Sequence, residues 1–170
     1  MPRRRPSPAR QWRKVDLHLH TTSSNDYQEP DASYLDILRQ AHNRELAMVA
    51  FTDHNTVAGY RALRQEVTEL ELLERLDRLK PAEKQRLQEY RKLQQSVLVM
   101  PGFEFTATFG FHILGLFSPD TPVRAIEHVL LNLNIPAASL DEGSSNAGAS
   151  ADVLTAYREI ATAGGIAIAA

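Results

Sequence analysis

Polar and apolar residues alternate without interruption over residues 15–20. The polar positions are Asp16, His18 and His20, and every position between them is apolar. Because successive side chains of an extended strand point to opposite faces, the alternation predicts a strand with these three side chains on one face. Such a face is typical of a strand whose apolar side is covered by helices and whose polar side meets a ligand, although an ordinary solvated face would show the same pattern.

Four more apolar runs predict strands, at residues 47–52, 97–106, 110–117 and 166–170. The first of these runs is followed by Asp53, His54 and Asn55, as expected for a buried parallel strand that presents polar groups at its carboxyl end. The next two runs each contain one isolated ionisable residue, Glu104 and His112. Burying such a residue is costly unless it is paired or bound to a metal ion.

The segments between the predicted strands show the spacing of apolar residues that is typical of helices. A helix is predicted after Pro30, with a buried side formed by Leu35, Leu38, Ala41 and Leu46. Another helix begins after the second strand, capped by Asn55 or Thr56. Two later helices have apolar stripes, which are Ile126, Val129, Leu130 and Leu133 in one and Val153, Leu154, Tyr157 and Ile160 in the other. His42 and His128 are expected at the surface.

Residues 61–95 form a long, charge-rich helical pattern that is interrupted only at Pro81. Proline is tolerated in the first turn of a helix, so this segment predicts a helical hairpin inserted between the second and third strands. Its apolar stripes are Leu70, Leu73 and Leu76 or Leu79 in the first helix, and Leu87, Tyr90 and Leu93 in the second. We expect these stripes to pack against each other; partner binding or self-association is the alternative.

The order of strands and helices predicts an α/β fold of the (β/α) barrel type, with polar residues at the carboxyl ends of its strands. Five strands cannot close such a barrel, and the last would be an apolar edge, so we expect the front part of a longer protein. Residues 139–150 are rich in Ser, Gly and Ala and predict a mobile loop near the active edge.

The amino-acid composition limits which partners and which metal ligands this protein can have. The 43% of hydrophobic and 24% of charged residues are ordinary for one globular domain, and a net charge of −2 argues against extensive coating by nucleic acid. The chain contains no cysteine, which excludes disulfides and thiolate chemistry and leaves histidine and carboxylates as the strong metal ligands. With no membrane-length apolar run and no evident signal peptide, we expect a cytoplasmic protein that does not bind membranes.

Residues 1–13 contain three prolines and five arginines and predict a disordered basic tail, with a phosphate-binding arm as the alternative. Trp12 is expected to pack against the outside of the domain just before the first strand.

Taken together and in order, the motifs resemble the polymerase and histidinol phosphatase (PHP) family. They are Asp-Leu-His-Leu-His at 16–20, Asp26, Phe-Thr-Asp-His-Asn at 51–55, Pro-Gly-Phe-Glu at 101–104 and His-Ile-Leu-Gly at 112–115. The resemblance implies a distorted (β/α)7 TIM-like barrel, truncated after about five strands. Residues 14–170 would be the N-terminal part of a PHP domain, with 61–95 as its helical hairpin insertion, and further ligands would lie beyond Ala170.

The resemblance also implies up to three divalent metal ions, zinc, manganese or iron. The implied ligands are His18 and His20 for one ion, Asp26 and His54 for a second, and His112 for a third, with Glu104 shared between the first and third. Asp16 and Asp53 are implied as the acids that hold the imidazoles in the correct tautomer for catalysis.

These ligands point to a metal-dependent phosphoesterase, in which a metal-bridging hydroxide attacks a phosphomonoester, a nucleotide or a nucleic-acid end. A metal-dependent amide hydrolase is an alternative, because His-x-His after a first barrel strand also occurs in that superfamily, but the motifs at 52–55 and 102–104 argue against it. A third possibility is a non-catalytic metal-binding or regulatory module, linked to a downstream ATPase domain or partner. No Walker-type loop and no Ser-His-Asp order is present.

Overall fold

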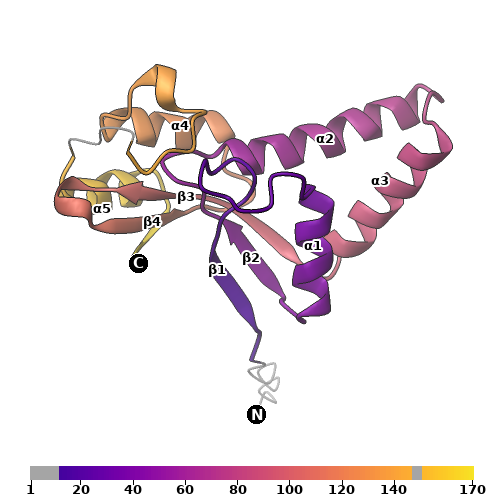
Figure 1. Cartoon of the computed structure of the whole chain (residues 1–170), viewed down its shortest axis with the longest axis horizontal. Coiled ribbons are helices and arrows are strands. Elements are labelled where there is room, and N and C mark those ends of the chain that lie inside the picture. The colour runs from indigo at the N-terminus through magenta and orange to yellow at the C-terminus, as the bar shows by residue number, and fades with distance from the viewer. Residues whose placement is uncertain (1–11, 147–150) are drawn as a thin grey trace, which may run out of the picture.

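A curled five-stranded sheet in the order β1-β2-β3-β4-β5 forms the centre of the molecule (Figure 1). The computed structural model describes residues 12–146 and 151–170. The strands are β1 (Val15–Leu19), β2 (Met48–Phe51), β3 (Leu98–Thr106), β4 (His112–Leu116) and β5 (Ile166–Ala169). The half-barrel shape of this sheet agrees with the predicted α/β class and with a truncated barrel.

The direction of β4 corrects the expectation of an all-parallel barrel. Strands β1, β2 and β3 are parallel, but β4 runs antiparallel to β3, and β5 runs antiparallel to β4. Only a short turn, the 3₁₀ helix η1 (Thr108–Gly110), joins β3 to β4. A parallel connection needs a crossover of a dozen or more residues, so this short turn can only make a hairpin.

Five α-helices pack around the sheet within the described residues. They are α1 (Tyr34–Asn43), α2 (Ala58–Arg75), α3 (Pro81–Gln94), α4 (Val123–Asn132) and α5 (Val153–Thr162), and a second 3₁₀ turn is η2 (Ala137–Ser139). Ser33 and Asp36 form a capping box at the start of α1, as the sequence at this point favours. The predicted stripes of α1 and α4 are buried, and His42 and His128 are exposed, as expected.

Helices α2 and α3 form the predicted helical hairpin, which projects from the sheet (Figure 1). Its inner face is formed by the buried residues Leu70, Leu87, Tyr90 and Leu93. Leu79 packs against the core, whereas Leu76 is 54% exposed, so Leu79 completes the stripe. The Tyr90 hydroxyl donates to Glu66 across the hairpin at 2.7 Å. Among the described residues, the apolar stripes of the two helices therefore pack inside the protein.

Three local expectations are wrong. Trp12 is 99% exposed and does not pack on the domain. Leu154 is 74% exposed and Tyr157 is 36% exposed, and α5 instead buries Ala156 with Ile160. The cap of α2 is Val57 without a side-chain hydrogen bond, although the Thr56 hydroxyl accepts the N–H of Ala58 at 3.0 Å.

Part of the chain lies outside the described residues. The expected tail at 1–13 falls there apart from residues 12 and 13, and so do residues 147–150 of the predicted loop. The described part of that loop meets the loop after β1, because the N–H of Asn25 donates to the Gly143 carbonyl at 2.9 Å. No helix among the described residues combines the length and the apolar character needed to cross a membrane.

Candidate metal centre

Parallel strands deliver the predicted polar residues to one edge of the sheet. Thr52 fixes the end of β1 to the end of β2, since its hydroxyl accepts the N–H of Leu19 at 3.0 Å and its own N–H donates to the Leu19 carbonyl at 2.8 Å. A bridge between His54 and Glu104 continues this pairing toward β3. The carboxyl ends of β1 and β2 therefore lie beside the carboxyl-terminal part of β3, which contains Glu104.

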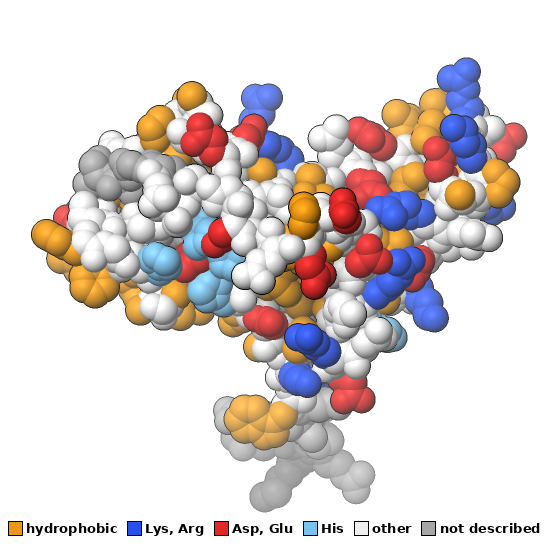
Figure 2. Space-filling model, viewed as in Figure 1, with side chains coloured by type: hydrophobic (Ala, Val, Ile, Leu, Met, Phe, Trp, Pro, Cys, Tyr) orange, Lys and Arg blue, Asp and Glu red, His pale blue; other side chains and the backbone are white. Residues whose placement is uncertain are grey.

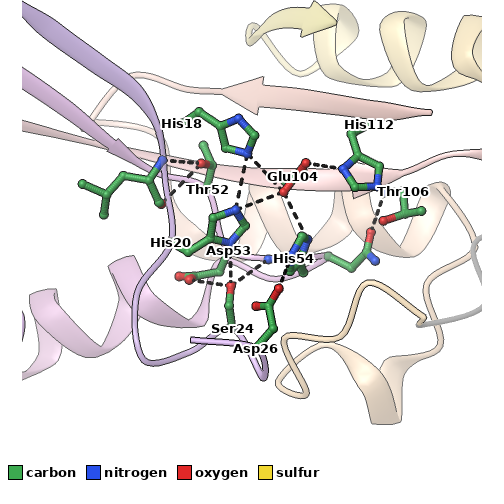
Figure 3. Close-up of polar contacts among 12 residues, drawn as sticks. His18, His20, Ser24, Asp26, Thr52, Asp53, His54, Glu104, Thr106 and His112 are labelled. Atoms are coloured by element: carbon green, nitrogen blue, oxygen red, sulfur yellow. Dashed lines mark hydrogen bonds and ion pairs between the residues drawn. The ribbon is translucent and has the colours of Figure 1, made fainter. Parts of the chain in front are cut away.

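Glu104 is the centre of the resulting cluster (Figure 3). Its side chain is 2% exposed, and its Oε2 lies 3.2 Å from His18 Nε2, 3.1 Å from His20 Nε2 and 3.1 Å from His54 Nδ1. The two Nε2 atoms of His18 and His20 are 3.3 Å apart. His112 Nδ1 contacts the other carboxylate oxygen, Oε1. Four predicted ligands thus surround one buried carboxylate.

These contacts leave buried polar atoms without hydrogen bonds. Glu104 Oε2 and His54 Nδ1 are both buried and make no hydrogen bond with any described residue, although they lie 3.1 Å apart. Leaving such atoms unpaired is costly, and a cation among them would remove that cost. The cluster therefore has the character of an ion-binding site.

The spacing fits a divalent ion. Donor atoms bound at 2.0–2.2 Å from one ion lie about 2.8–3.1 Å apart at adjacent octahedral positions and about 3.3–3.6 Å apart in tetrahedral geometry. The atoms His18 Nε2, His20 Nε2 and Glu104 Oε2 form a triangle with edges of 3.1, 3.2 and 3.3 Å. Imidazole and carboxylate are suitable donors for zinc, manganese or iron. The residues present therefore fit the metal that the sequence predicts.

A second set of potential ligands adjoins the first and consists of His20, Asp26 and His54. His54 Nε2 lies 3.1 Å from Asp26 Oδ2. His20 belongs to both sets, whereas the sequence assigned it to one ion. The proposed third pairing, His112 with Glu104, contains two ligands within the described part of the chain.

The charges within the cluster influence one another. Burial alone would raise the pKa of the Glu104 carboxyl, but the neighbouring imidazoles of His20 and His18 lower that pKa to about 2. The Glu104 carboxylate in turn raises the pKa of His20 above the ordinary histidine value, against the opposing effect of burial. Glu104 therefore stays ionised near neutral pH and attracts either a proton or a metal cation to its imidazole neighbours.

Asp53 anchors the loop that follows β1. This carboxylate is 1% exposed and accepts hydrogen bonds from the Thr21 N–H at 2.6 Å, the Thr21 hydroxyl at 2.8 Å and the Ser24 hydroxyl at 2.9 Å. Burial raises the pKa of Asp53, although these hydrogen bonds oppose the rise. Gly59 at the start of α2 leaves room for this network, because a Cβ there would lie 2.2 Å from Asp53 Oδ2.

The same network fixes the tautomer of His20. The hydroxyl hydrogen of Ser24 is donated to Asp53, and Ser24 Oγ also lies 2.9 Å from His20 Nδ1. Because its one hydrogen is already used, Ser24 must accept a hydrogen bond from Nδ1–H. The Nε2 lone pair of neutral His20 is then free to face the ion. Asp53 therefore acts on the imidazole through Ser24.

Asp16 lines the same cavity as His18 and His20, but its described hydrogen bond is to the backbone. Its Oδ1 accepts the backbone N–H of His18 at 3.2 Å, and among the described contacts it does not touch an imidazole. Sequence reasoning did not connect Ser24 with His20, since a Ser-rich loop after a strand is equally typical of an ordinary turn. Its four-residue spacing from His20 was the available signal.

A cavity of about 650 Å³ opens beside the cluster, between β1, α1 and the loop after β1. His18, His20 and Asp26 line one side, and Tyr27 and Glu29 belong to the lining contributed by the loop. This volume is ordinary for a small-molecule site. The face of the molecule that carries the histidines shows them beside acidic side chains, whereas Lys and Arg gather over α1, α2 and α3 (Figure 2).

Comparison with known proteins supports the fold. No protein-family model and no curated protein matches this sequence. Among solved structures, the chain is similar to a protein of Bifidobacterium adolescentis that is named, provisionally, a metal-dependent phosphoesterase. The TM-score is 0.51 at 16% sequence identity, and the match covers 95% of this chain and 67% of the other. At this identity the similarity establishes a shared α/β fold.

Proposed function

We propose that this chain belongs to a metal-dependent phosphoesterase, whose substrate is a phosphomonoester, a nucleotide or a nucleic-acid end. The observation that carries the proposal is the triangle of His18 Nε2, His20 Nε2 and Glu104 Oε2, with edges of 3.1 to 3.3 Å. The shared fold with a provisionally named metal-dependent phosphoesterase supports it. The ordered motifs that resemble the PHP family support it from the sequence.

The reaction would be hydrolysis, in which water and a phosphoester give an alcohol and a phosphate. Divalent ions, when bound, activate water for attack and neutralise the charge that develops on the phosphoryl group. His18, His20 and Glu104 would hold one ion, and Asp26 with His54 would hold a second beside it. Ser24 and Asp53 would keep His20 in the tautomer that binds metal, and the adjoining cavity would admit the substrate.

The test is phosphate release with added Mn²⁺ or Zn²⁺ from p-nitrophenyl phosphate, mononucleotides and single-stranded oligonucleotides. We expect release that depends on metal and is lost in His18→Ala and Glu104→Ala. His42→Ala and His128→Ala are matched controls, because these histidines are exposed and lie outside the cluster. Release that survives both cluster variants, or hydrolysis of amides alone, would refute the proposal.

A further inference from the structure

Asp26, a candidate ligand of the second ion, has few contacts of its own. Its side chain is 62% exposed, and within the described residues its carboxylate has one hydrogen-bond partner, His54 Nε2 at 3.1 Å. It lies in a tight turn, which the N–H of Tyr27 closes by donating to the Ser24 carbonyl at 3.1 Å. Among the described contacts, Asp53 anchors this loop only as far as Ser24. The position of the Asp26 carboxylate therefore depends on what holds the turn.

Residues 139–146, which we call the strap, lie against this turn (Figure 1). The Gly143 carbonyl accepts the N–H of Asn25 at 2.9 Å. The fit is close, because a Cβ on Gly143 would lie 1.7 Å from the carbonyl oxygen of Ser23 and 3.0 Å from the Cα of Ser24. The φ of Gly143 is +58°, in the left-handed region that glycine adopts freely. Glycine therefore allows the strap to approach the turn this closely.

Asn55 ties the strap to the sheet beside the candidate metal centre. It is 0% exposed and directly follows His54. Its Nδ2 donates to the Ser144 carbonyl at 2.9 Å, and its Oδ1 accepts the N–H of Thr106, at the end of β3, at 3.0 Å. A backbone N–H can only donate and a carbonyl can only accept, so this position needs an amide. One buried side chain thus connects the strap to the strand that contains Glu104.

The strap is also anchored at its beginning. Leu140 packs against the hydrophobic core. Arg61 of α2 donates to Asp141 at 2.5 Å and to Glu127 of α4 at 2.5 Å. Arg61 and Asp141 are 38% and 66% exposed, so this ion pair contributes little. The buried contacts of Leu140 and Asn55 therefore determine where the strap lies.

We propose that Asn55 and Gly143 are positioning residues for the second ion, because through the strap they hold the turn that contains Asp26. This inference rests on the metal centre of the proposed function and concerns one of its ions. Two ligands of the first ion, His18 and Glu104, lie on β1 and β3, which are joined through β2 and not through the strap. Releasing the strap should therefore weaken binding of the second ion and leave the first ion in place.

Asn55→Asp is the sharpest test. Aspartate has nearly the same shape and tolerates the left-handed φ of +52° at this position. Its carboxylate still accepts the Thr106 N–H but has no hydrogen to donate to the Ser144 carbonyl. Calorimetric titration with Mn²⁺ should then show the second ion bound about 5- to 150-fold more weakly, with the first ion bound as in the parent. Asp26→Ala, which removes a ligand of the second ion, gives the one-ion reference.

Gly143→Ala is the second variant, and Gly164→Ala is its matched control. Both glycines have a left-handed φ, +58° and +79°, so alanine brings the same kind of backbone strain to each. A Cβ on Gly164 has nothing within 4 Å, whereas one on Gly143 collides with the turn. Only Gly143→Ala should weaken the second ion, and Asn55→Asp decides the question if that variant does not fold. Asp141→Asn, which alters the exposed ion pair, should bind both ions as the parent does.

Two readouts separate positioning from a general loss of structure. Electron paramagnetic resonance with Mn²⁺ should show spin coupling between neighbouring ions in the parent and in Gly164→Ala, but isolated ions in Asn55→Asp. In the metal-free protein, the amide of Asn25 should exchange with solvent faster in Asn55→Asp, because its hydrogen bond to Gly143 is released. The amides of β2 and β3 should exchange as in the parent.

The outcomes separate the two proposals. Second-ion affinity that is unchanged in Asn55→Asp, or equal losses of both ions, overturns the role of the strap and leaves the phosphoesterase intact. Selective loss of the second ion, in a protein whose parent hydrolyses no phosphoester, supports the role of the strap and refutes the proposed function. A parent protein that binds one ion alone also overturns the role of the strap, since there is then no second ion to position.

Discussion

Replacing Ser24 by alanine should weaken metal binding without removing any ligand. The hydroxyl of Ser24 donates to Asp53, faces His20 Nδ1 at 2.9 Å and accepts the backbone N–H of His54 at 3.2 Å. All three contacts disappear in the variant, while Asp53 keeps both of its bonds from Thr21. Neutral His20 is then free to populate the tautomer that places a hydrogen on Nε2, where the ion must bind.

The magnitude follows from the burial of these groups. Ser24 is 3% exposed and His54 is 7% exposed, so the backbone N–H of His54 loses its partner away from water. An unsatisfied buried donor costs about 1–3 kcal/mol, which is the expected loss in free energy of unfolding. Removal of a group that orients a metal-bound histidine costs about 10- to 100-fold in metal affinity.

Three measurements check this prediction. Competition with a chromogenic chelator gives the affinity for Zn²⁺, denaturant unfolding gives the stability, and ¹⁵N chemical shifts of the metal-free protein give the tautomer of His20. Ser23→Ala is the matched control, because its hydroxyl contacts Tyr34 at 3.2 Å and does not reach His20. A Ser24→Ala variant that binds zinc within twofold of the parent and keeps Nδ1–H on His20 would refute the reasoning.

Three further predictions follow. Gly59→Ala should lower the free energy of unfolding by about 1–3 kcal/mol and should also lower metal affinity, because the new Cβ would lie 2.2 Å from Asp53 Oδ2. Thermal unfolding and metal titration check this prediction, and a fully stable variant would contradict it. Leu87 is 0% exposed, so Leu87→Ala should lower the free energy of unfolding, measured with denaturant, by about 2–5 kcal/mol. Leu72 is 46% exposed, so Leu72→Ala should lower it much less. Similar losses in the two variants would argue against the packing of the helical hairpin. Metal affinity should fall as pH drops from about 8 to 6, because protons compete for imidazoles whose ordinary pKa is about 6.5. Glu104, with a pKa of about 2, remains ionised over this range, and the raised pKa of His20 means that protons begin to compete with the metal at a higher pH. Calorimetry in two buffers should detect proton release on metal binding. A pH-independent affinity would contradict the prediction.

Much of the fold could be read from the sequence because the relevant signals are local. The alternation around His18, the apolar run before Asp53 and the proline at the turn of the helical hairpin each involve residues close in the chain, and the periodicity of a strand or helix is set by such neighbours. The exposed positions of Trp12 and Leu154 were missed, because hydrophobicity indicates what can be buried and not whether a partner surface is present.

The candidate site was predicted as a set of ligand types, but its geometry was not. Histidine and carboxylate at the ends of apolar strands indicated metal chemistry, since isolated charges are costly to bury. The sequence could not reveal that His20 belongs to both sets of ligands or that Asp53 acts through Ser24. These relationships join distant residues, 29 positions apart for Ser24 and Asp53 and 84 for His20 and Glu104, whose separation in space depends on strand register.

By itself, the sequence determined which segments are strands and helices and which side chains can hold a metal ion, because both follow from residue chemistry and short-range spacing. The reversal of β4 against β3 also follows from local spacing, because the short connection between them excludes a parallel crossover. The tertiary structure alone decided that Glu104 is surrounded by three imidazole nitrogens at 3.1–3.2 Å and that Gly59 leaves space for Asp53. Such contact distances arise from how distant segments pack, and no local pattern of residues specifies them.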